Sequence, residues 1–318
     1  MCSDDIWLVT VPVGHNLALL DGITGCVFIG GKQVLLDSTR PGDIVETIQR
    51  ERVTYMPMVP SLLKRIADFE ELEQYDLSSL RKVSAGGEVS TPGLIREVNT
   101  RLGCKYINEF GMSEGLLLRT RLDYDLETIC NTVGRPCCPY DQVKVLGAQG
   151  GELPVNTDGE LATKGPGIFA GYLKNTEEKN SRVFTVDGFF RTGDIARVDD
   201  SGNIKITGRI KDIIIRGGEN ISPAQVEDLL RMHPSISDAA VIGIPDKNLG
   251  ELVCAYVQPA PDTQPDPQEI AAFMLGKGAS RLLIPERFEY IDAIPLTQAG
   301  KSDKKALRED MKRRLRQL

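Results

Sequence analysis

The sequence predicts an α/β fold made of three parts. These are a partial doubly wound core over residues 1–120, a small β-barrel-like subdomain over 121–208, and a separate α+β C-terminal domain over 209–318. Strand-like and helix-like segments alternate in the first part, which is typical of a parallel sheet. Short strands separated by Gly, Asp, Pro and Asn turns fill the second part, and helices and strands mix in the third.

The first part reads as parallel βαβ units, because each apolar run is followed by turn signals or by helix start and stop signals. In chain order, these signals are two apolar runs around Gly30 and Gly31, a helix over 41–51, a strand over 52–56, a helix from Thr91 and Pro92 to Gly103, and a strand over 104–108.

The second and third parts carry shorter elements. Ser222 to Gln225 has the spacing of a capping box before a helix whose apolar face holds Val226, Leu229 and Leu230. The remaining signals are strands over 142–147, 159–164, 203–207, 237–244 and 287–292, a proline-dense loop over 259–267 with a helix after it, and a basic helix at the C-terminus.

Composition excludes several classes of protein. The net charge of −7 argues against nonspecific binding of nucleic acid, and the sequence has no apolar stretch that approaches the ~20 residues of a membrane span. The first residues lack the layout of a signal peptide, and the 7 cysteines form no C-x-x-C pair. We therefore expect a cytoplasmic protein without a membrane or nucleic-acid partner. His15 and His233 are the only histidines and stand in unrelated contexts, so a Ser-His-Asp triad has weak support.

Six polar, glycine-flanked segments stand in a fixed order along the chain. Each alone is typical of an ordinary turn, and only their order and separation are specific. The segments are Gly86-Gly87-Glu88, Asn108 to Gly115, Phe190 to Asp194, Gly208 to Asp212, Arg216 to Asn220, and Pro295 to Lys301.

Together these segments resemble the motifs of the adenylate-forming superfamily, which contains acyl-CoA synthetases, nonribosomal-peptide adenylation domains and luciferases. The resemblance covers essentially the whole chain. Residues 12–16, 110–116, 120–123 and 131–136 look like the aryl-acid branch, the 2,3-dihydroxybenzoate– or salicylate–AMP ligases of siderophore assembly. The resemblance implies that an aryl carboxylic acid reacts with ATP to give aryl-AMP and pyrophosphate. The acyl group would then pass to the phosphopantetheine thiol of a carrier protein, or to coenzyme A.

The resemblance also implies roles for single residues. Lys301 would bridge the carboxylate and phosphate oxygens, with a solvent-exposed loop lysine as the alternative. Glu114 would hold Mg²⁺, a cation that prefers oxygen ligands, or it would be an ordinary carboxylate at a helix start. Phe110 would stack on adenine or belong to the core, and Asp194 would bind the ribose hydroxyls. The implied ATP and AMP contacts are Gly86, Gly87, Asn108, Phe110, Gly111, Met112, Ser113, Asp194 and Arg209.

His15, Asn16, Asp21 and Leu117 are the candidates for the acid pocket. Asn16 can bind a ring hydroxyl, and Leu117 would line the ring. Dihydroxybenzoate ligases have a serine where this chain has Asp21. An unpaired aspartate would repel the substrate carboxylate, but it could accept a bond from a ring amino group, a ring N–H or an extra hydroxyl. Hydroxyanthranilate and hydroxypicolinate types of acid are therefore alternatives to plain 2,3-dihydroxybenzoate.

In this family the C-terminal domain rotates between the two half-reactions. Lys211 stands at the position of the hinge residue, although an ordinary turn between domains explains the local sequence equally well. Rotation would withdraw Lys301 and bring Gly217 and Gly218 to the tunnel that admits the pantetheine thiol.

The family's Ser/Thr/Gly-rich phosphate loop does not occur in these 318 residues. We therefore expect the chain to be the C-terminal part of a longer enzyme, to expose apolar surface in residues 1–120, and to be weakly active or inactive alone. Two further interpretations remain open. The first is an acyl- or aryl-CoA ligase, which Glu88 and the run 217–223 resemble at least as well as they resemble the aryl-acid branch. The second is a noncatalytic fragment that binds nucleotide or a carrier protein.

Overall fold

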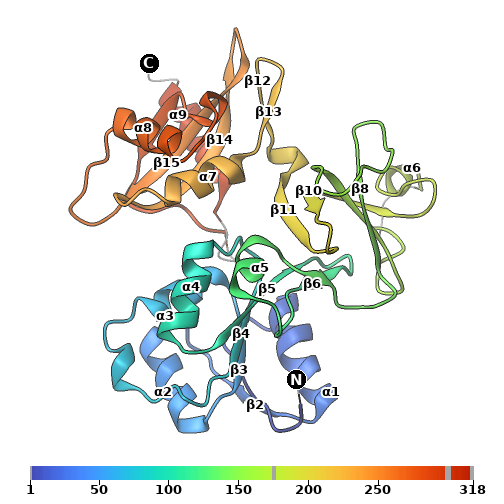
Figure 1. The fold of residues 1–318 in the computed structure, drawn as a ribbon, viewed down its shortest axis with the longest axis vertical. Helices are drawn as coiled ribbons and strands as arrows, with labels where there is room; N and C mark the ends of the chain where they lie inside the picture. Colours follow the sequence, from blue (N-terminus) through green and yellow to red (C-terminus); the bar gives the residue numbers. More distant parts are fainter. Residues whose placement is uncertain (1, 174–176, 298–301, 316–318) are drawn as a thin grey trace. The chain divides into compact units, whose positions relative to one another are not determined.

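The computed structural model describes residues 2–173, 177–297 and 302–315 (Figure 1). It divides into two compact units. The first unit consists of Met1–Thr157, Ala162–Thr192 and Arg197–Lys205, and the second of Asp158–Leu161, Gly193–Ala196 and Ile206–Leu318. The predicted α/β fold with an α+β C-terminal region is confirmed.

A largely parallel sheet forms the centre of the first unit. Its strand order is β2-β1-β3-β4-β5-β6-β7, and the pairs from β2 to β5 are parallel whereas β5-β6 and β6-β7 are antiparallel. The order 2-1-3-4-5 is a doubly wound arrangement. The strands are β1 (Ile6–Val9), β2 (Lys32–Leu35), β3 (Tyr55–Met58), β4 (Lys82–Ala85), β5 (Lys105–Gly111), β6 (Leu117–Arg119) and β7 (Arg135–Pro136).

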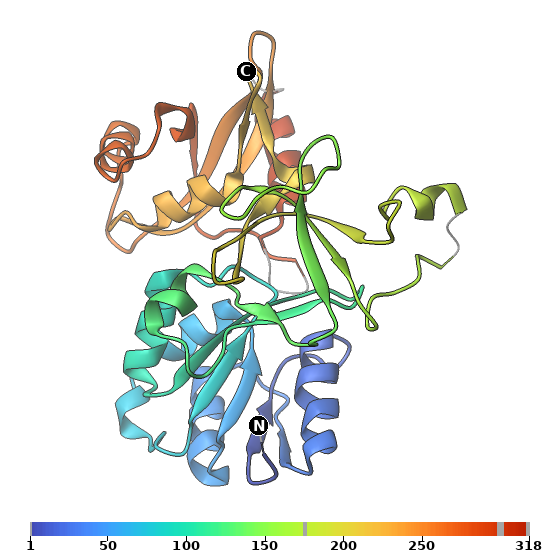
Figure 2. The ribbon, with the colours of Figure 1, turned by 45° about the vertical axis from the view of Figure 1, so that its right-hand side comes forward.

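Helices cover both faces of this sheet. Figures 1 and 2 show α2, α3 and α4 on one face, with η1 and α1 on the other. The segment η1 is π-helical, a rare form that occurs frequently at functional sites. The helices are η1 (Leu17–Thr24), α1 (Gly25–Ile29), α2 (Pro41–Glu51), α3 (Pro60–Ala67), η2 (Leu72–Gln74), α4 (Pro92–Arg101) and α5 (Leu126–Asn131).

The helix starts follow the predicted signals. The helix predicted over 41–51 is confirmed as α2, and α4 begins after Thr91, whose side chain accepts a hydrogen bond from the Leu94 N–H. Proline fills the first position of both helices, where its missing N–H costs nothing. Gly103 has a φ of 66° just after α4, a left-handed conformation that favours glycine.

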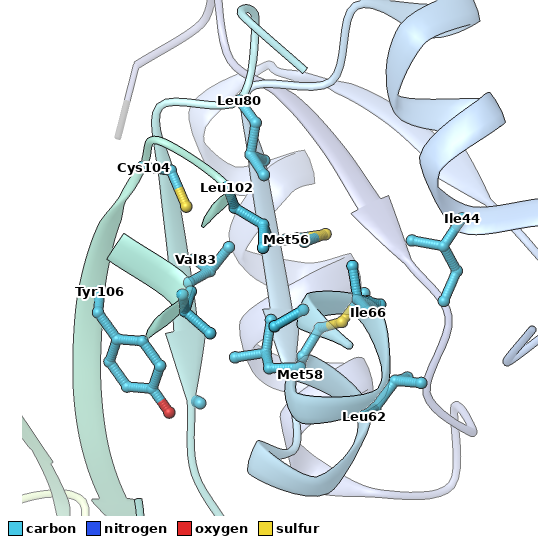
Figure 3. Close-up of a cluster of buried hydrophobic side chains, with 14 of the residues drawn as sticks. Ile44, Met56, Met58, Leu62, Ile66, Leu80, Val83, Leu102, Cys104 and Tyr106 are labelled. Carbon is cyan, nitrogen blue, oxygen red and sulfur yellow. The ribbon is translucent and has the colours of Figure 1, made fainter. Parts of the chain in front are cut away.

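The core of the first unit lies between the sheet and helices α2 to α4. Figure 3 shows Met56 and Met58 of β3 and Val83 of β4 against Ile44 and Ile66 of the helices. These side chains are fully buried, and such burial contributes roughly 1.5–3 kcal/mol for each large apolar side chain. On the other face, α1 leaves Val27 and Phe28 69% and 90% exposed, in line with the expected apolar surface.

An ion cluster lies at the amino ends of the parallel strands. Asp5 precedes β1 and accepts bonds from Lys82 at 2.9 Å, Arg81 at 2.8 Å and the Thr54 hydroxyl at 2.9 Å. Burial alone would raise the pKa of the Asp5 carboxyl, but bonds from Lys82, the Cys2 backbone and Thr54 lower it well below its usual range. The cluster therefore joins three strands at the edge opposite their carboxyl ends.

A four-stranded sheet follows, in the order β11-β10-β9-β8. The strands predicted over 142–147, 159–164 and 203–207 are confirmed in it. The loop between β9 and β10 carries α6 (Glu177–Ser181). Phe169 and Phe184 of this loop form a cluster of aromatic rings with Phe190, the first residue of β10. The strands are β8 (Gln142–Leu146), β9 (Gly159–Lys164), β10 (Phe190–Val198) and β11 (Ile204–Arg209).

A mixed sheet with helices on both sides forms most of the second unit. Its order is β13-β12-β15-β14, and β16 pairs with β15 in parallel. Ala239 and Val241 of β14 pack on one side with α7 and α8, whereas Ala240 and Ile242 pack on the other with α9. The elements are η3 (Ile210–Asp212), β12 (Ile214–Arg216), β13 (Glu219–Ile221), α7 (Pro223–Arg231), β14 (Ile236–Asp246), β15 (Gly250–Pro259), α8 (Pro267–Gly276), η4 (Arg281–Leu283), β16 (Arg287–Tyr290) and α9 (Lys304–Leu315).

One predicted helix start differs in detail. The side chain of Ser222 makes no capping bond to α7, so the expected capping box is wrong. Its hydroxyl instead donates to the carbonyl of Thr207 at 2.6 Å. The tertiary contact therefore competes with the local cap, and Pro223 alone marks the helix start. In the described part of the chain, no helix is both long and apolar enough to cross a bilayer.

Candidate active site

Most of the predicted site residues in the first unit follow the carboxyl ends of its parallel strands. His15 and Asn16 come after β1, Gly86 and Gly87 follow β4 directly, and Ser113 lies just beyond β5. In doubly wound sheets, ligands bind outside the carboxyl ends of the strands. The topology therefore places segments far apart in sequence along the edge at which such a sheet binds ligands.

A hydrogen bond joins the segment predicted for the acid to the segment predicted for the nucleotide. Asn16 Nδ2 donates to Ser113 Oγ at 2.9 Å. The ring of His15 is oriented by its own turn, because His15 Nδ1 accepts from the Leu17 N–H at 3.2 Å. The two motifs, 97 residues apart, thus meet within one unit.

The hairpin of β5 and β6 carries Phe110, Gly111, Met112 and Leu117. Gly111 pairs with Leu117, and a Cβ at position 111 would lie 3.1 Å from Leu117 Cδ1. A side chain at this position would therefore require the Leu117 side chain to shift. Phe110 is half-buried beside Leu118, so its predicted stacking on adenine stays a prediction.

Asn108 holds neighbouring protein segments together. Its side chain is 6% exposed, and its Nδ2 donates to the Thr132 carbonyl at 2.9 Å and the Ile129 carbonyl at 3.3 Å. These bonds satisfy the last turn of α5, which would otherwise leave carbonyls without partners. These bonds give Asn108 a structural role, and its predicted role at the nucleotide stays a prediction.

Glu114 is held at both its side chain and its main chain. Its Oε1 accepts a hydrogen bond of 2.7 Å from the Tyr172 hydroxyl, and its carbonyl accepts from the Phe169 N–H at 2.9 Å. Burial and the neighbouring Glu114 carboxylate raise the pKa of Tyr172 to about 12, so the tyrosine stays a donor at neutral pH. Tyr172 was not among the predicted residues, and no sequence signal paired it with Glu114.

Gly86 lies directly against Glu109. A Cβ at Gly86 would lie 2.6 Å from Glu109 Cγ, closer than real Cβ contacts allow. Gly87 has a φ of 87°, which L-residues rarely adopt. The backbone after β4 therefore depends on glycine at both positions, and the predicted approach of this backbone to a nucleotide stays a prediction.

Asp21 is paired, although the sequence left its partner open. Its carboxylate forms an ion pair with Arg119, and Arg119 Nε also donates to Glu109 Oε2 at 2.8 Å. The Tyr55 hydroxyl donates to Asp21 Oδ2 at 3.2 Å, and Tyr55 and Ser84 share a hydrogen bond of 2.7 Å. The pairing removes the repulsion expected from an isolated aspartate.

Burial dominates the electrostatics of this group. The Glu109 side chain is 4% exposed, and its burial raises the pKa of its carboxyl although Arg119 lowers it in part. The sequence analysis placed Glu109 inside a motif but gave it no role in the site. It also gave no role to Arg119, Tyr55 or Ser84. The available signal was an acidic residue inside a mostly apolar strand, in which residues 106–109 are all buried.

Asp194 and Arg209 lie together in the second unit. Arg209 Nε donates to Asp194 Oδ1 at 2.5 Å, and Asp194 is 1% exposed. The strands β10 and β11 are neighbours in one sheet and bring the two side chains together. The pair joins two residues that the sequence assigned to the ribose and phosphates, and those assignments stay predictions.

The predicted hinge and tunnel residues lie in exposed turns of the second unit. Lys211 is exposed in η3, and the adjacent Asp212 accepts from Arg308 of α9 at 3.2 Å. Gly217 and Gly218 form the turn between β12 and β13, with φ of 57° and 88°. Lys301 lies outside the described residues.

No group of three or more His, Cys, Asp or Glu side chains within the described ranges could hold a metal ion. The seven cysteines are free. A cation at Glu114 would therefore need further oxygen ligands from phosphates or water, which is the usual coordination of Mg²⁺.

Comparisons with known proteins agree with this arrangement. Residues 1–173 match the model of the AMP-binding enzyme family, and residues 225–301 match the model of the AMP-binding enzyme C-terminal domain. The chain is 40% identical over 311 residues to the 2,3-dihydroxybenzoate-AMP ligase of Bacillus subtilis, covering 98% of this chain and 57% of the relative. It therefore spans little more than half the length of that relative.

Two other proteins are also similar to this chain. A protein of Streptomyces sp. named salicylyl-CoA synthase / salicylate adenylyltransferase is 38% identical, covering 96% of this chain and 56% of its own length. The crystal structure of ATP-bound MatB from Rhodopseudomonas palustris matches with a TM-score of 0.90 at 28% identity, over 98% of this chain and 61% of that one.

Proposed function

Because the chain belongs to the AMP-binding enzyme family, we propose that it serves the ATP-dependent activation of an aryl carboxylic acid. The observation that carries this proposal is the Asn16–Ser113 hydrogen bond, which joins the acid and nucleotide motifs at one sheet edge. The similarity to 2,3-dihydroxybenzoate- and salicylate-activating proteins supports an aryl acid. The chain spans 57% of the first of these relatives, so the activity is proposed for the protein in that context.

The proposed reaction has two half-reactions. In the first, an oxygen of the acid's carboxylate bonds to the α-phosphorus of ATP, and the bond to the β-phosphate oxygen breaks to release pyrophosphate. In the second, a thiol attacks the acyl carbon, AMP leaves, and the thiol proton goes to solvent. Both reacting groups of the first step are anions, so preorganised cations and donors are needed.

The residues of this chain would divide that work. Glu114 would hold Mg²⁺ through a carboxylate oxygen, and the ion would supply positive charge at the phosphates. Lys301 would add a second positive charge between carboxylate and phosphate. Asp194 would accept from the ribose hydroxyls with Arg209 beside it, and the backbone at Gly86 and Gly87 would approach the nucleotide without a Cβ in the way.

The domain organisation is part of the proposal. We expect the region from residue 209 onward to move about a hinge near Lys211, so that Lys301 serves the first half-reaction and Gly217 and Gly218 the second. The exposure of Lys211 supports this, because a residue at a hinge must be solvated in both states.

The thiol acceptor is either a carrier protein's phosphopantetheine or coenzyme A. We favour the carrier, as in siderophore or aryl-capped peptide assembly. The CoA alternative rests on one specific observation, a relative whose name includes salicylyl-CoA synthase. Supplying free coenzyme A or a phosphopantetheinylated aryl carrier protein, and detecting the thioester by mass spectrometry, distinguishes the two.

The testing experiment is ATP–pyrophosphate exchange over a panel of aryl acids. It is run on the chain alone and with the remaining N-terminal region of a related ligase, because the chain aligns with 57% of that length. Exchange that depends on an aryl acid supports the proposal. Clearly measurable exchange by the chain alone overturns our expectation that the chain by itself is weakly active or inactive. ATP binding without exchange in either sample would favour a noncatalytic binding role.

A further inference from the structure

Two ion pairs hold one face of α9, the last helix of the second unit. Lys304 of α9 pairs with Glu227 of α7 at 2.7 Å, and Arg308 of α9 donates to Asp212 Oδ1 of η3 at 3.2 Å. Residues four apart on a helix are neighbours on its surface, so both pairs form on one side of α9. We call these four residues the α9 clamp.

The Lys304–Glu227 pair is the more buried of the two. The two side chains are 20% and 10% exposed, and Glu227 Oε1 also accepts a hydrogen bond from the Val241 N–H at 2.8 Å. Val241 lies in β14, at the edge of the mixed sheet, and α7 and α9 pack on opposite faces of this strand. A single carboxylate therefore joins both helices and the strand between them, and its bonds fix the first turn of α9.

The chain just before α9 is also fixed to the start of this helix. Leu296 and Ser302 form an antiparallel bridge, and the Asp303 N–H donates to the Pro295 carbonyl at 2.7 Å. Asp303 Oδ1 accepts from a backbone N–H in the first turn of α9 at 3.0 Å. Lys301 directly precedes Ser302 in the sequence. Both ends of the segment that contains Lys301 are therefore anchored at α9.

The second pair of the clamp lies beside the predicted hinge. Arg308 holds Asp212, whereas the two residues that precede Asp212 in η3, Ile210 and Lys211, are exposed. Before them, Arg209 is held by its bond to the carboxylate of β10 described above. Because residues 209 and 212 are both anchored, a change in chain direction here must come from the backbone dihedral angles of the two residues between them.

We infer that Lys304 and Arg308 are positioning residues for the first half-reaction. Through the α9 clamp, η3, α9 and both ends of the segment that contains Lys301 move as one body, so rotation about Ile210 and Lys211 is transmitted in full to Lys301. The inference rests on the proposed function and deepens it, because it names residues that act on the first step through α9. The strand β12, which leads into the turn proposed for the second half-reaction, is held by β13 and β15 and not by the clamp.

The first test needs no turnover. Hydrogen–deuterium exchange of the full chain, followed by mass spectrometry of peptides that contain η3, measures how firmly this segment is held. The Ile213 N–H is the reporter, since it donates to the Arg209 and Ile210 carbonyls. We expect Arg308→Gln to speed deuterium exchange of residues 210–213 at least about twofold, an effect within the range of a partly exposed ion pair.

Two controls separate the clamp from a general effect of the substitution. Arg313→Gln removes another arginine of α9, one that pairs with Asp310 outside the clamp, and should leave deuterium exchange in η3 unchanged. Combining Asp212→Arg with Arg308→Asp restores the pair with its charges exchanged. This double variant should exchange more slowly in η3 than Asp212→Arg alone, and the two proteins have the same sequence in the peptide that is measured.

The second test separates the two half-reactions. ATP–pyrophosphate exchange by the chain, supplied with the N-terminal region of a related ligase, follows the first, and transfer from synthetic aryl-AMP to the thiol follows the second. We expect Lys304→Gln to lower kcat of the first at least about tenfold without raising KM for the acid or ATP, because Glu227 loses its buried partner and Lys301 its fixed position. Lys304→Arg keeps the charge and should retain most of the activity. Neither variant should change the second half-reaction.

The outcomes are distinct. Equal deuterium exchange in Arg308→Gln and Arg313→Gln, or an equal loss of both half-reactions in Lys304→Gln, would overturn the inference while leaving the proposed function intact. If the wild-type protein shows no pyrophosphate exchange that depends on an aryl acid, the proposed function and the inference are both overturned. Circular dichroism verifies the folding of each variant. If Lys304→Gln fails to fold, Arg308→Gln replaces it, and its kcat should fall in the first half-reaction only.

Discussion

The Tyr172 hydroxyl donates a hydrogen bond of 2.7 Å to Oε1 of Glu114, 58 residues earlier in the chain. The Tyr172 ring packs edge-on against Phe169 with centroids 4.8 Å apart, and the Phe169 N–H bonds the Glu114 carbonyl. One short segment therefore fixes both the backbone and the carboxylate of the residue proposed to hold Mg²⁺.

Replacing Tyr172 by Phe removes that donor and keeps the ring. Because partners of a metal ligand orient it, we expect Tyr172→Phe to raise about tenfold the Mg²⁺ concentration needed for half-maximal ATP binding. Calorimetric titration of ATP at a series of Mg²⁺ concentrations measures this. Tyr140→Phe, at a tyrosine that is 75% exposed, is the control. Equal Mg²⁺ dependence in both variants would contradict the positioning of Glu114 by Tyr172.

Replacing Asp194 by Asn removes the negative charge beside Arg209 and one acceptor oxygen. We expect Asp194→Asn to weaken AMP binding about tenfold, since a hydrogen bond to a charged group contributes roughly 1.5–3 kcal/mol. Equilibrium binding of AMP measures the change, with Asp200→Asn in the exposed turn after β10 as the control. An unaltered affinity in Asp194→Asn would remove Asp194 from the nucleotide site.

Two glycine-to-alanine changes should have opposite effects on stability. In Gly86→Ala the new Cβ meets Glu109 Cγ at 2.6 Å, so we expect a loss of about 1–3 kcal/mol. In Gly93→Ala the nearest atom is 4.0 Å away, within helix α4, so we expect a gain of about 0.5–1 kcal/mol. Urea unfolding of both variants tests the pair, and a stable Gly86→Ala protein would show that Glu109 moves freely.

The Asp5 cluster predicts a pH dependence of stability. The pKa of Asp5 is lower in the folded state than its ordinary value of 3.8. The ionised carboxylate therefore contributes to the free energy of unfolding above pH 3.8, and this contribution is lost as the pH falls toward the folded-state pKa. We expect Asp5→Asn to cost about 3 kcal/mol at pH 7, as for a broken buried ion pair, and much less near pH 2. Unfolding free energies at both pH values provide the check. A constant difference would show that the charge of Asp5 is not what stabilises the strands.

The sequence predicted correctly those helices and strands that depend on residues close together in the chain. The helix over 41–51, the start of α4 at Thr91 and the strand over 159–164 depend on periodicity and capping, and each is present. The motif order likewise led to the AMP-binding family. These features need little information from distant parts of the chain.

What could not be predicted is pairing between distant residues. Arg119 forms an ion pair with Asp21, which is 98 positions earlier in the chain, and no residue near Asp21 in the sequence indicates that a cation lies beside it. Ser222 failed as a cap for the same reason, since the Thr207 carbonyl competes for its hydroxyl. Tertiary geometry decides such contacts, so the polar partners of the site were visible only in the fold.

The Asp5 cluster also bears on the order in which the chain acquires structure. Its partners Thr54, Arg81 and Lys82 come 49, 76 and 77 residues later. The ion pairs of Asp5 can therefore form only after the start of β4 has been synthesised, whereas the Thr54 hydroxyl, which precedes β3, is available earlier. Such distant contacts slow folding, because the intervening chain must be closed into a loop before they form. Closing the ion pairs of Asp5 therefore adds a long-range step to the folding of this sheet.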